Sequence, residues 1–364
     1  MTSASSVLAA VFAIWIGLTP AAAQTPPDVS PPTWEVEVHG GFAAARSSRE
    51  WTGAIPPRPG VIAVPEIGRN AVLVDSWFFG RGNTAFWQAQ APGPGRPEIA
   101  SLDPAITNPA ATWGPGLDLG LRLRRRVTDR FSAELSVTYA AGGYRLSSDA
   151  RSTLEHSRDT FQTAWLAFFA RHPETYVAAA VTSESSTSGG PAGRLVTTGS
   201  LVVDLTPGAI TTPYLTVGAG VAASPGATLT ATLSGRYRFL AHGVAPIDET
   251  DSVTVRFSPG GPTMLLVMGG GLKRELSSRW GITGDVRMWL GADRRITTIS
   301  TAATTVAAAP AGAAIDTRNL PVVFSTRPDL RTSLSGDGVT DFETMRLSGP
   351  RVQFSMAVGL VRRF

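Results

Sequence analysis

The sequence predicts an all-β fold: an antiparallel up-and-down transmembrane β-barrel. Three observations carry this prediction. Several segments alternate apolar and polar residues, long and short connections alternate between those segments, and only 16% of the residues are charged although 43% are hydrophobic. A soluble domain typically has about 25% charged residues. Alternating strands can cross a bilayer without a continuous apolar run, because half of their side chains face the barrel interior.

The C-terminal segment, residues 351–364, shows the alternation most clearly. One face carries mainly apolar side chains, and the other carries mainly small or polar ones. The apolar face comprises Val352, Phe354, Met356, Val358, Leu360 and Phe364, interrupted by Arg362. The segment is somewhat longer than the about 9–11 residues that a tilted membrane strand needs. It therefore predicts a strand that crosses the bilayer.

Other segments alternate in the same way and complete a predicted barrel of eight strands. They are residues 34–46, 116–125, 131–141, 195–205, 214–223, 264–276 and 280–290. Residues 227–239 and 252–258 also alternate, so a barrel of ten strands is the alternative. We favour eight strands, because Pro225-Gly226 and Pro259-Gly260 break the chain where a loop hairpin would leave the barrel.

Long connections at 47–112, 142–193, 224–262 and 291–350 alternate with short ones, as extracellular loops alternate with periplasmic turns in outer-membrane barrels. The second long connection contains an amphipathic helix near 152–171, which begins with the capping-box pair Ser152 and Glu155. We expect the aromatic stripe of this helix to pack over the barrel mouth or against the first loop. Residues 182–193 are rich in Gly and Ser and predict a flexible exit.

The N-terminus predicts export. Residues 1–23 contain an apolar core and end in Ala21-Ala22-Ala23, so we expect a signal peptide cleaved near Ala23/Gln24. A Pro-rich periplasmic lead-in, residues 24–33, precedes the barrel domain at 34–364. The chain has no cysteine, which excludes disulfides and cysteine-based metal sites.

The polar faces of the predicted strands place charges of both signs inside the barrel. An eight-stranded barrel is only wide enough to be filled by side chains, and an isolated buried charge costs several kcal/mol. We therefore expect a charge network that plugs the lumen. Its members are Glu35, Glu37, Asp118, Arg122, Arg124, Glu134, Asp204, Lys273, Glu275, Asp285, Arg287 and Arg363.

Aromatic residues cluster at the predicted periplasmic ends of the strands. Trp34, Phe131, Trp280 and Phe364 would lie at that rim, with Tyr214 near it. This position is typical of an aromatic girdle at the membrane interface.

The strand pattern together with the terminal Phe364 resembles the small OmpA/OmpX-like barrels of the bacterial outer membrane. The resemblance covers the strands, about a third of the chain, and includes no specific motif. It implies an outer-membrane location, contact with lipid and lipopolysaccharide, and recognition of the C-terminal strand by the barrel-assembly machinery. The implied role is structural or interactive, with an unknown extracellular ligand bound by the loops.

Other functions have weaker support in the sequence. A small channel for polar solutes is the main alternative; a soluble secreted β protein and an outer-membrane hydrolase rank lower. No GxSxG or HExxH motif is present, His39 fits the polar filling of the lumen, and the neighbours His156 and Ser157 cannot face each other on a helix. We therefore expect no enzyme activity, no catalytic residue and no cofactor.

Metal and nucleic-acid binding are also disfavoured. Two acidic loop clusters could offer oxygen ligands to calcium, but neither matches an EF-hand loop, so we assign no metal site. The clusters are Asp248, Glu249 and Asp251, and Asp337, Asp341 and Glu343. The high isoelectric point reflects an arginine bias, since Lys273 is the only lysine, and no basic cluster with interleaved aromatics predicts nucleic-acid binding.

Overall fold

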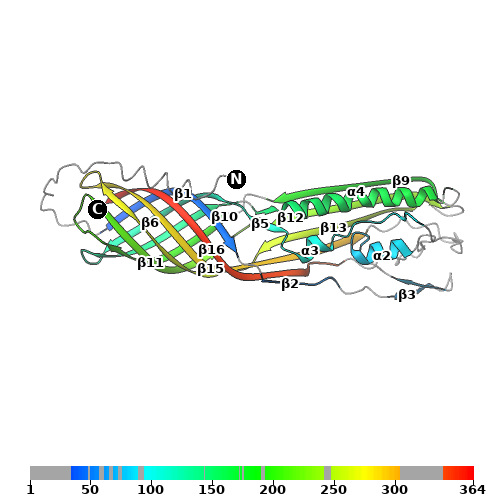
Figure 1. Cartoon of the computed structure of the whole chain (residues 1–364), viewed down its shortest axis with the longest axis horizontal. Coiled ribbons are helices and arrows are strands. Elements are labelled where there is room, and N and C mark those ends of the chain that lie inside the picture. Colours follow the sequence, from blue (N-terminus) through cyan, green and yellow to red (C-terminus); the bar gives the residue numbers. More distant parts are fainter. Residues whose placement is uncertain are drawn as a thin grey trace.

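The computed structural model describes residues 34–47, 50–56, 61–64, 69–72, 76–88, 94–142, 144–171, 173, 176–189, 193–241, 247–303 and 339–364. The expected signal peptide (1–23) and lead-in (24–33) lie outside these residues. The molecule is elongated, with a barrel at one end and a lobe of strands and helices at the other (Figure 1). We call the barrel end that carries the short connections the turn end, and the opposite end the lobe end.

A closed ring of antiparallel strands forms the barrel. Each strand pairs with the next around the ring, and β16 pairs with both β15 and β1, which closes the sheet. In ring order, the strands are β1 (Trp34–Ser47), β6 (Gly116–Arg126), β7 (Phe131–Ala141), β10 (Gly193–Asp204), β11 (Thr211–Ala223), β14 (Thr263–Glu275), β15 (Trp280–Ala303) and β16 (Phe342–Arg363).

The period of two in the sequence becomes an inside and an outside in the barrel. Successive side chains of a strand point to opposite faces. In β6, Leu119 is 64% exposed on the outer surface, whereas the neighbouring Asp118 is fully buried in the interior. Every second residue of β7 is buried in the same way. Apolar side chains therefore cover the outside of the ring and polar ones fill its interior.

The lobe grows out of the barrel sheet. At the lobe end, β15 and β16 continue beyond the ring and stay paired as far as Ile299 and Phe342. The outer part of β15 pairs with β13 (Ile247–Pro259), β13 pairs with β12 (Leu229–Ala241), and β12 pairs with β9 (Tyr176–Gly189). On the other side, β2 (Glu50–Gly53) pairs with β16. The barrel and the lobe thus share one continuous 12-stranded sheet.

Shorter elements complete the lobe and the junction. They are the hairpin of β3 (Val61–Val64) with β4 (Arg69–Val72), the helices α2 (Gly80–Gln88), α3 (Asp103–Thr107) and α4 (Ser148–Arg171), and the pair of β5 (Ala111–Trp113) with β8 (Tyr144–Leu146). Among the described residues, no helix has the length and hydropathy needed to span a membrane.

An aromatic core holds the lobe together. Trp165 of α4 is completely buried and stacks on Tyr237 of β12 with ring centroids 4.3 Å apart. Trp165 also packs edge-on against Trp77, at 5.3 Å, while Phe161 stacks on Phe78 at 4.7 Å. Residues 77 and 78 belong to the first long connection. The prediction that the helix packs against the first loop is therefore confirmed.

The long connections are more regular than the sequence suggested. Residues 227–239 and 252–258 do form a hairpin, which lies in the lobe sheet and not in the barrel ring. The prediction of a flexible exit at 182–193 is wrong for residues up to Gly189, because β9 pairs with β12 there. The expected loop at 291–350 is likewise strand at both ends, in β15 and β16. Small Ser, Thr and Ala side chains look like linker in a sequence, yet pairing with a neighbour orders them.

The lobe core predicts a local effect of mutation. We expect Trp165→Ala to destabilise the lobe by about 3–5 kcal/mol, because a large buried aromatic is replaced by a cavity. Limited proteolysis and near-ultraviolet circular dichroism would detect the loosened lobe. Leu166→Ala is the matched control, since Leu166 is the exposed neighbour on the same helix. Equal proteolysis of the two variants would contradict this account of the core.

Candidate functional site

The charged side chains predicted for the lumen come together in the turn half of the barrel. Closest to the turn end, Glu35 is surrounded by three cations: Arg363 Nε at 3.2 Å, Lys273 Nζ at 3.3 Å and Arg124 Nη1 at 3.7 Å. Strand pairing dictates this group, because Glu35 lies opposite Arg124 on one side and Arg363 on the other. Asp204 approaches Lys273 at 3.9 Å.

A second layer of ion pairs lies deeper in the lumen. Arg122 pairs with Glu37 at 2.7 Å and with Asp285 at 2.5 Å, and Arg287 pairs with Asp285 at 3.1 Å. Glu134 connects the two layers, since it receives Arg287 Nη1 at 2.6 Å and Arg124 Nη2 at 3.0 Å. These side chains come from β1, β6, β7 and β15, so the network ties together strands from around the ring.

Two of the predicted lumen residues behave differently from the rest. Asp118 takes part in no ion pair with the described residues and instead accepts a hydrogen bond from the Ser355 hydroxyl. Glu275 lies at the turn end with a side chain that is 43% exposed, and it pairs there with Arg363 at 2.8 Å. Its position on the last residue of β14 explains the exposure.

Tyr214 does not belong to the aromatic girdle that the sequence predicted. The sequence placed it near the rim, but its ring is buried inside the barrel and its hydroxyl donates to Asp285 Oδ2 at 2.9 Å. Tyr214 lies opposite Asp204 in the register, so both side chains point inward. Arg124 lies over its ring, 5.0 Å from the centroid. Trp34, Phe131, Trp280 and Phe364 are exposed at the turn end, as predicted.

Glycines show how closely this part of the lumen is packed. A Cβ atom at Gly359 would lie 2.5 Å from Glu37 Oε1 and 2.6 Å from Thr283 Oγ1. A Cβ atom at Gly120 would lie 2.6 Å from the ring of His39. All three distances are shorter than van der Waals contact, so a methyl group would not fit at either glycine without movement of its neighbours. His39 itself lies within 3.3 Å of Thr138 Oγ1, as part of the polar filling that the sequence predicted.

A second polar cluster, which the sequence analysis missed, lies at the lobe end of the lumen. Arg194 Nη1 donates to Gln353 Oε1 at 2.8 Å, and Arg351 Nη2 lies 3.4 Å from the same oxygen. Arg351 also approaches Asp293 at 3.9 Å. The alternation around Arg194 could have assigned it to the inner face. However, Asp293 fell in the segment 291–350, which was interpreted as a loop.

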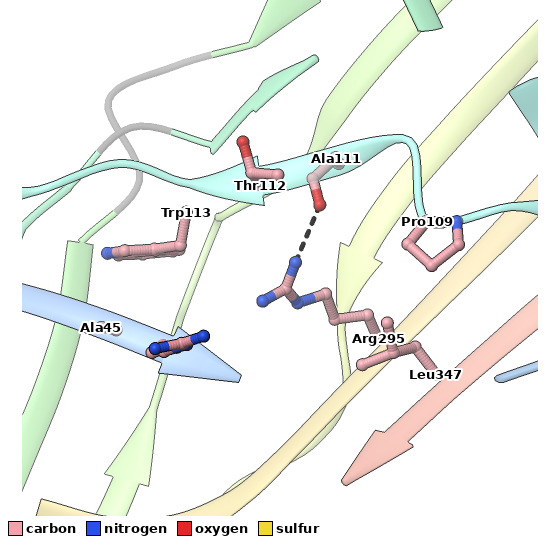
Figure 2. A pocket seen from close by; sticks show the side chains of 8 residues that line it. Ala45, Pro109, Ala111, Thr112, Trp113, Arg295 and Leu347 are labelled. Atoms are coloured by element: carbon pink, nitrogen blue, oxygen red, sulfur yellow. Dashed lines mark hydrogen bonds between the residues drawn. The ribbon is translucent and has the colours of Figure 1, made fainter. Parts of the chain in front are cut away.

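This cluster adjoins a cavity of about 360 Å³ between the barrel and the lobe. Its lining comprises Ala45, Arg46, Pro109, Ala111, Thr112, Trp113, Arg295 and Leu347. Figure 2 shows the Arg295 guanidinium reaching the Ala111 carbonyl, with Trp113 and Leu347 on opposite sides of the cavity. Arg351 lies over the face of the Trp113 ring, 5.5 Å from its centroid, so Trp113 contacts both this cavity and the lumen cluster.

The acidic loop residues do not assemble a calcium site. Glu249 and Asp251 are buried in the lobe, where Glu249 accepts the Tyr237 hydroxyl and Asp251 accepts Ser76 Oγ at 2.8 Å and the Trp77 amide at 2.7 Å. Burial and the Glu249 carboxylate hold the pKa of Tyr237 well above its usual value. Asp248 points to the opposite face and pairs with Arg236 at 2.5 Å.

The second acidic cluster is only partly visible. Asp341 approaches Arg256 at 3.5 Å, Glu343 pairs with Arg346 at 2.8 Å, and Asp337 lies outside the described residues. No group of metal-ligating side chains occurs in the part of the chain that the structure describes. His156 is exposed on α4 while the neighbouring Ser157 is buried, so the two are not placed to act as base and nucleophile.

Comparison with known proteins finds a distant likeness to several solved structures. No protein-family model and no curated protein matches the sequence. The outer membrane protein OprG from Pseudomonas aeruginosa aligns with a TM-score of 0.36 and 10% identity over 92% of this chain and 98% of its own. A major outer membrane protein from Thermus thermophilus aligns with a TM-score of 0.24 and 13% identity over 70% of this chain and 96% of its own.

The toluene transporter TodX from Pseudomonas putida aligns with a TM-score of 0.21 and 10% identity, over 92% of this chain and 90% of TodX. Such low TM-scores establish neither a family nor a function. The barrel is established by the strand pairing of the chain itself, and membership of the OmpA/OmpX-like group stays a prediction.

The ion-pair network predicts a large effect from removing one shared carboxylate. Glu134→Gln should destabilise the barrel by about 3–5 kcal/mol, because Arg124 and Arg287 would each lose a buried partner. Urea unfolding in detergent would measure the loss. Glu155→Gln on the exposed surface of α4 is the control and should change stability by less than about 0.5 kcal/mol.

The double variant Glu134→Leu/Arg287→Met gives a second check. It removes both partners of one buried pair, so it should cost less than Glu134→Gln alone. If the double variant loses as much unfolding free energy as the two single variants Glu134→Leu and Arg287→Met lose in sum, the two side chains do not act as a pair.

Proposed function

We propose that this chain is an outer-membrane barrel whose lumen is closed by ion pairs and whose folded lobe presents a binding surface outside the cell. The observation that carries the proposal is the inside-out arrangement of the ring. Most of its inward charges are buried and paired with one another, while its large apolar side chains are exposed. A protein surrounded by water gains nothing from such an outer surface, whereas hydrocarbon favours it.

The exposed apolar side chains form a continuous belt. They occur on every strand of the ring and include Val38, Phe42, Leu117, Leu119, Leu121, Leu135, Val137, Leu201, Leu215, Val217, Leu266, Trp280, Phe354, Val358 and Leu360. β6 and β7 have 11 residues each, which matches the about 9–11 residues of a tilted membrane strand. The eight strands of the ring are therefore the proposed membrane strands, and β9, β12 and β13 stay outside the bilayer.

The turn end carries the features of a membrane interface. Trp34, Trp280 and Phe364 are exposed where the apolar belt ends. Arg125 lies over Trp34 at 5.3 Å, and Arg362 lies over Phe364 at 4.9 Å and Trp280 at 5.6 Å. Aromatic rings with adjacent cations suit the boundary between hydrocarbon and headgroups. Since short turns face the periplasm in such barrels, the lobe would face the outside.

A channel for polar solutes is the second candidate. Three buried hydroxyls of the lumen, those of Ser200, Thr216 and Thr283, make no hydrogen bond with the described residues. Buried polar groups normally have a partner, so solvent in the middle of the lumen would satisfy them. Two features argue against a steady pore: the paired charges of the turn half, and an apolar cluster toward the lobe end. The cluster comprises Val196, Ala222, Leu265, Val267 and Trp289.

Planar-bilayer conductance separates the two functions. The closed barrel should show no steady open state, because the ion-pair layers and the apolar cluster block the lumen in series. A constant ohmic conductance that Glu134→Gln increases would overturn the closed lumen and favour the channel.

A mutation on the outer belt tests membrane insertion. Leu119→Arg should destabilise the folded barrel by about 2–4 kcal/mol in a bilayer, because it places a charge in hydrocarbon. The fraction that migrates as the compact form on an SDS gel without boiling would report folding. Leu166→Arg is the control, since Leu166 is equally apolar but lies on the water-exposed face of the lobe helix. Equal folding yields would argue for a soluble β protein.

A further inference from the structure

On three strands of the ring, the outward-facing row of side chains ends in an arginine at the turn end. In β6, the exposed Leu121 and Leu123 are followed on the same face by Arg125. The outer faces of β16 and β14 end in Arg362 and Arg274 in the same way. Because side chains on one face of a strand share a direction, these arginines point toward the surroundings of the barrel and not into its lumen.

These arginines alternate with aromatic residues across five neighbouring strands. The strands are β14, β15, β16, β1 and β6, which pair in this order. In the register, Arg362 lies opposite Trp280, and Trp34 lies opposite Arg125. We call the outward residues at the turn ends of these strands the turn-end patch. In the same order, its members are Arg274, Trp280, Arg362, Phe364, Trp34 and Arg125.

Aromatic rings hold two of the guanidinium groups against the outer surface. Arg125 lies 5.3 Å from the centroid of the Trp34 ring, and Arg362 lies 4.9 Å from that of Phe364 and 5.6 Å from that of Trp280. Only β1 separates β6 from β16, and neighbouring strands are about 4.8 Å apart, so the two arginine backbones are about 10 Å apart across the barrel. The patch therefore presents two positive charges in defined positions, side by side, where the apolar belt ends.

No acidic side chain in the described part of the chain neutralises the patch. None of its three arginines forms an ion pair with a described residue. Within the described residues, the acidic side chains exposed at the turn end are those of Asp129 and Glu275, and Glu275 pairs with Arg363 of the lumen network. Further arginines in or beside the turns add to the positive charge of this end. They are Arg126, Arg130 and Arg279.

The chemistry of the patch fits the phosphate group of an anionic lipid. A guanidinium binds phosphate oxygens through paired hydrogen bonds, and side chains where the apolar belt ends have lipid headgroups as neighbours. A zwitterionic headgroup offsets its phosphate with its own cation, whereas an anionic headgroup leaves the phosphate charge to the arginines. Each basic residue at an anionic membrane surface strengthens binding about fivefold.

We propose that the turn-end patch binds the headgroups of anionic phospholipids in the leaflet that surrounds the turn end. The inference rests on the proposed function, because it requires the apolar belt to lie in a membrane. It adds the class of lipid that the barrel binds at this rim. With the short turns toward the periplasm, that leaflet is the inner leaflet of the outer membrane.

The test uses the full chain folded into vesicles of equal parts phosphatidylglycerol and phosphatidylcholine, in which one of the two lipids carries bromine on its acyl chains. Bromine quenches tryptophan fluorescence only at short range, so Trp34 and Trp280 report which lipid lies beside the patch. The signal of the other tryptophans is measured with Trp34→Phe/Trp280→Phe and subtracted. In wild type, phosphatidylglycerol should be preferred beside the patch by a factor of about five or more.

The decisive variant is Arg125→Gln/Arg274→Gln/Arg362→Gln. It removes the charges and keeps the reporting tryptophans, so the preference should fall to about one. The three single variants should each retain part of the preference, and they carry the test if the triple variant does not reach the compact form on an SDS gel.

A matched control removes the same number of charges from the lobe. It is Arg151→Gln/Arg171→Gln/Arg238→Gln, at exposed positions of α4 and β12. This variant should show the same lipid preference as wild type, because none of its substitutions lies at the turn end.

The remaining outcomes also decide. No preference in wild type, an unchanged preference in the patch variants, or an equal loss in the lobe control would each overturn the inference. Inorganic phosphate added at constant ionic strength should leave the preference unchanged; if it abolishes the preference, the arginines bind free phosphate ions and not the lipid. Absence of the compact gel form in wild type would instead refute the proposed membrane barrel, on which the patch depends.

Discussion

The structure depends on the double pairing of β16. This strand joins β1 on one edge and β15 on the other, so it turns an open sheet into a ring. Closure leaves the membrane part without an unpaired edge, which a strand structure in hydrocarbon requires. Beyond the ring, β15 and β16 stay paired with each other, and the strands of the lobe sheet pair with their outer parts. The pair of β15 and β16 therefore closes the barrel and also provides the strands to which the lobe sheet is attached.

Closure also determines how the charges behave. Once the ring forms, every inward side chain shares a narrow space with residues from strands distant in sequence, such as Glu134 with Arg287. Charges in that space are stable only with partners. The alternation of charged residues along β1, β6 and β15 is matched so that each layer contains both signs. The lobe is held differently, by aromatic stacking around Trp165 together with hydrogen bonds to buried carboxylates.

The barrel was largely predictable because its rule is local. The alternation of apolar and polar residues, together with the short turns, identifies strands such as β6 and β7 without knowledge of their partners. Because every second residue of such a strand faces inward, the same alternation identifies most of the charged residues of the lumen. Tyr214 was misplaced because its position near a strand end suggested the rim, whereas it alternates with the exposed Leu215 and therefore faces inward beside Asp204. The lobe was harder to predict. β9 is rich in Ser, Thr and Ala, and only its pairing with β12 makes it a strand. The polar cluster at the mouth combines β10 with β15 and β16, and one of its residues, Asp293, comes from a stretch that was expected to be a loop.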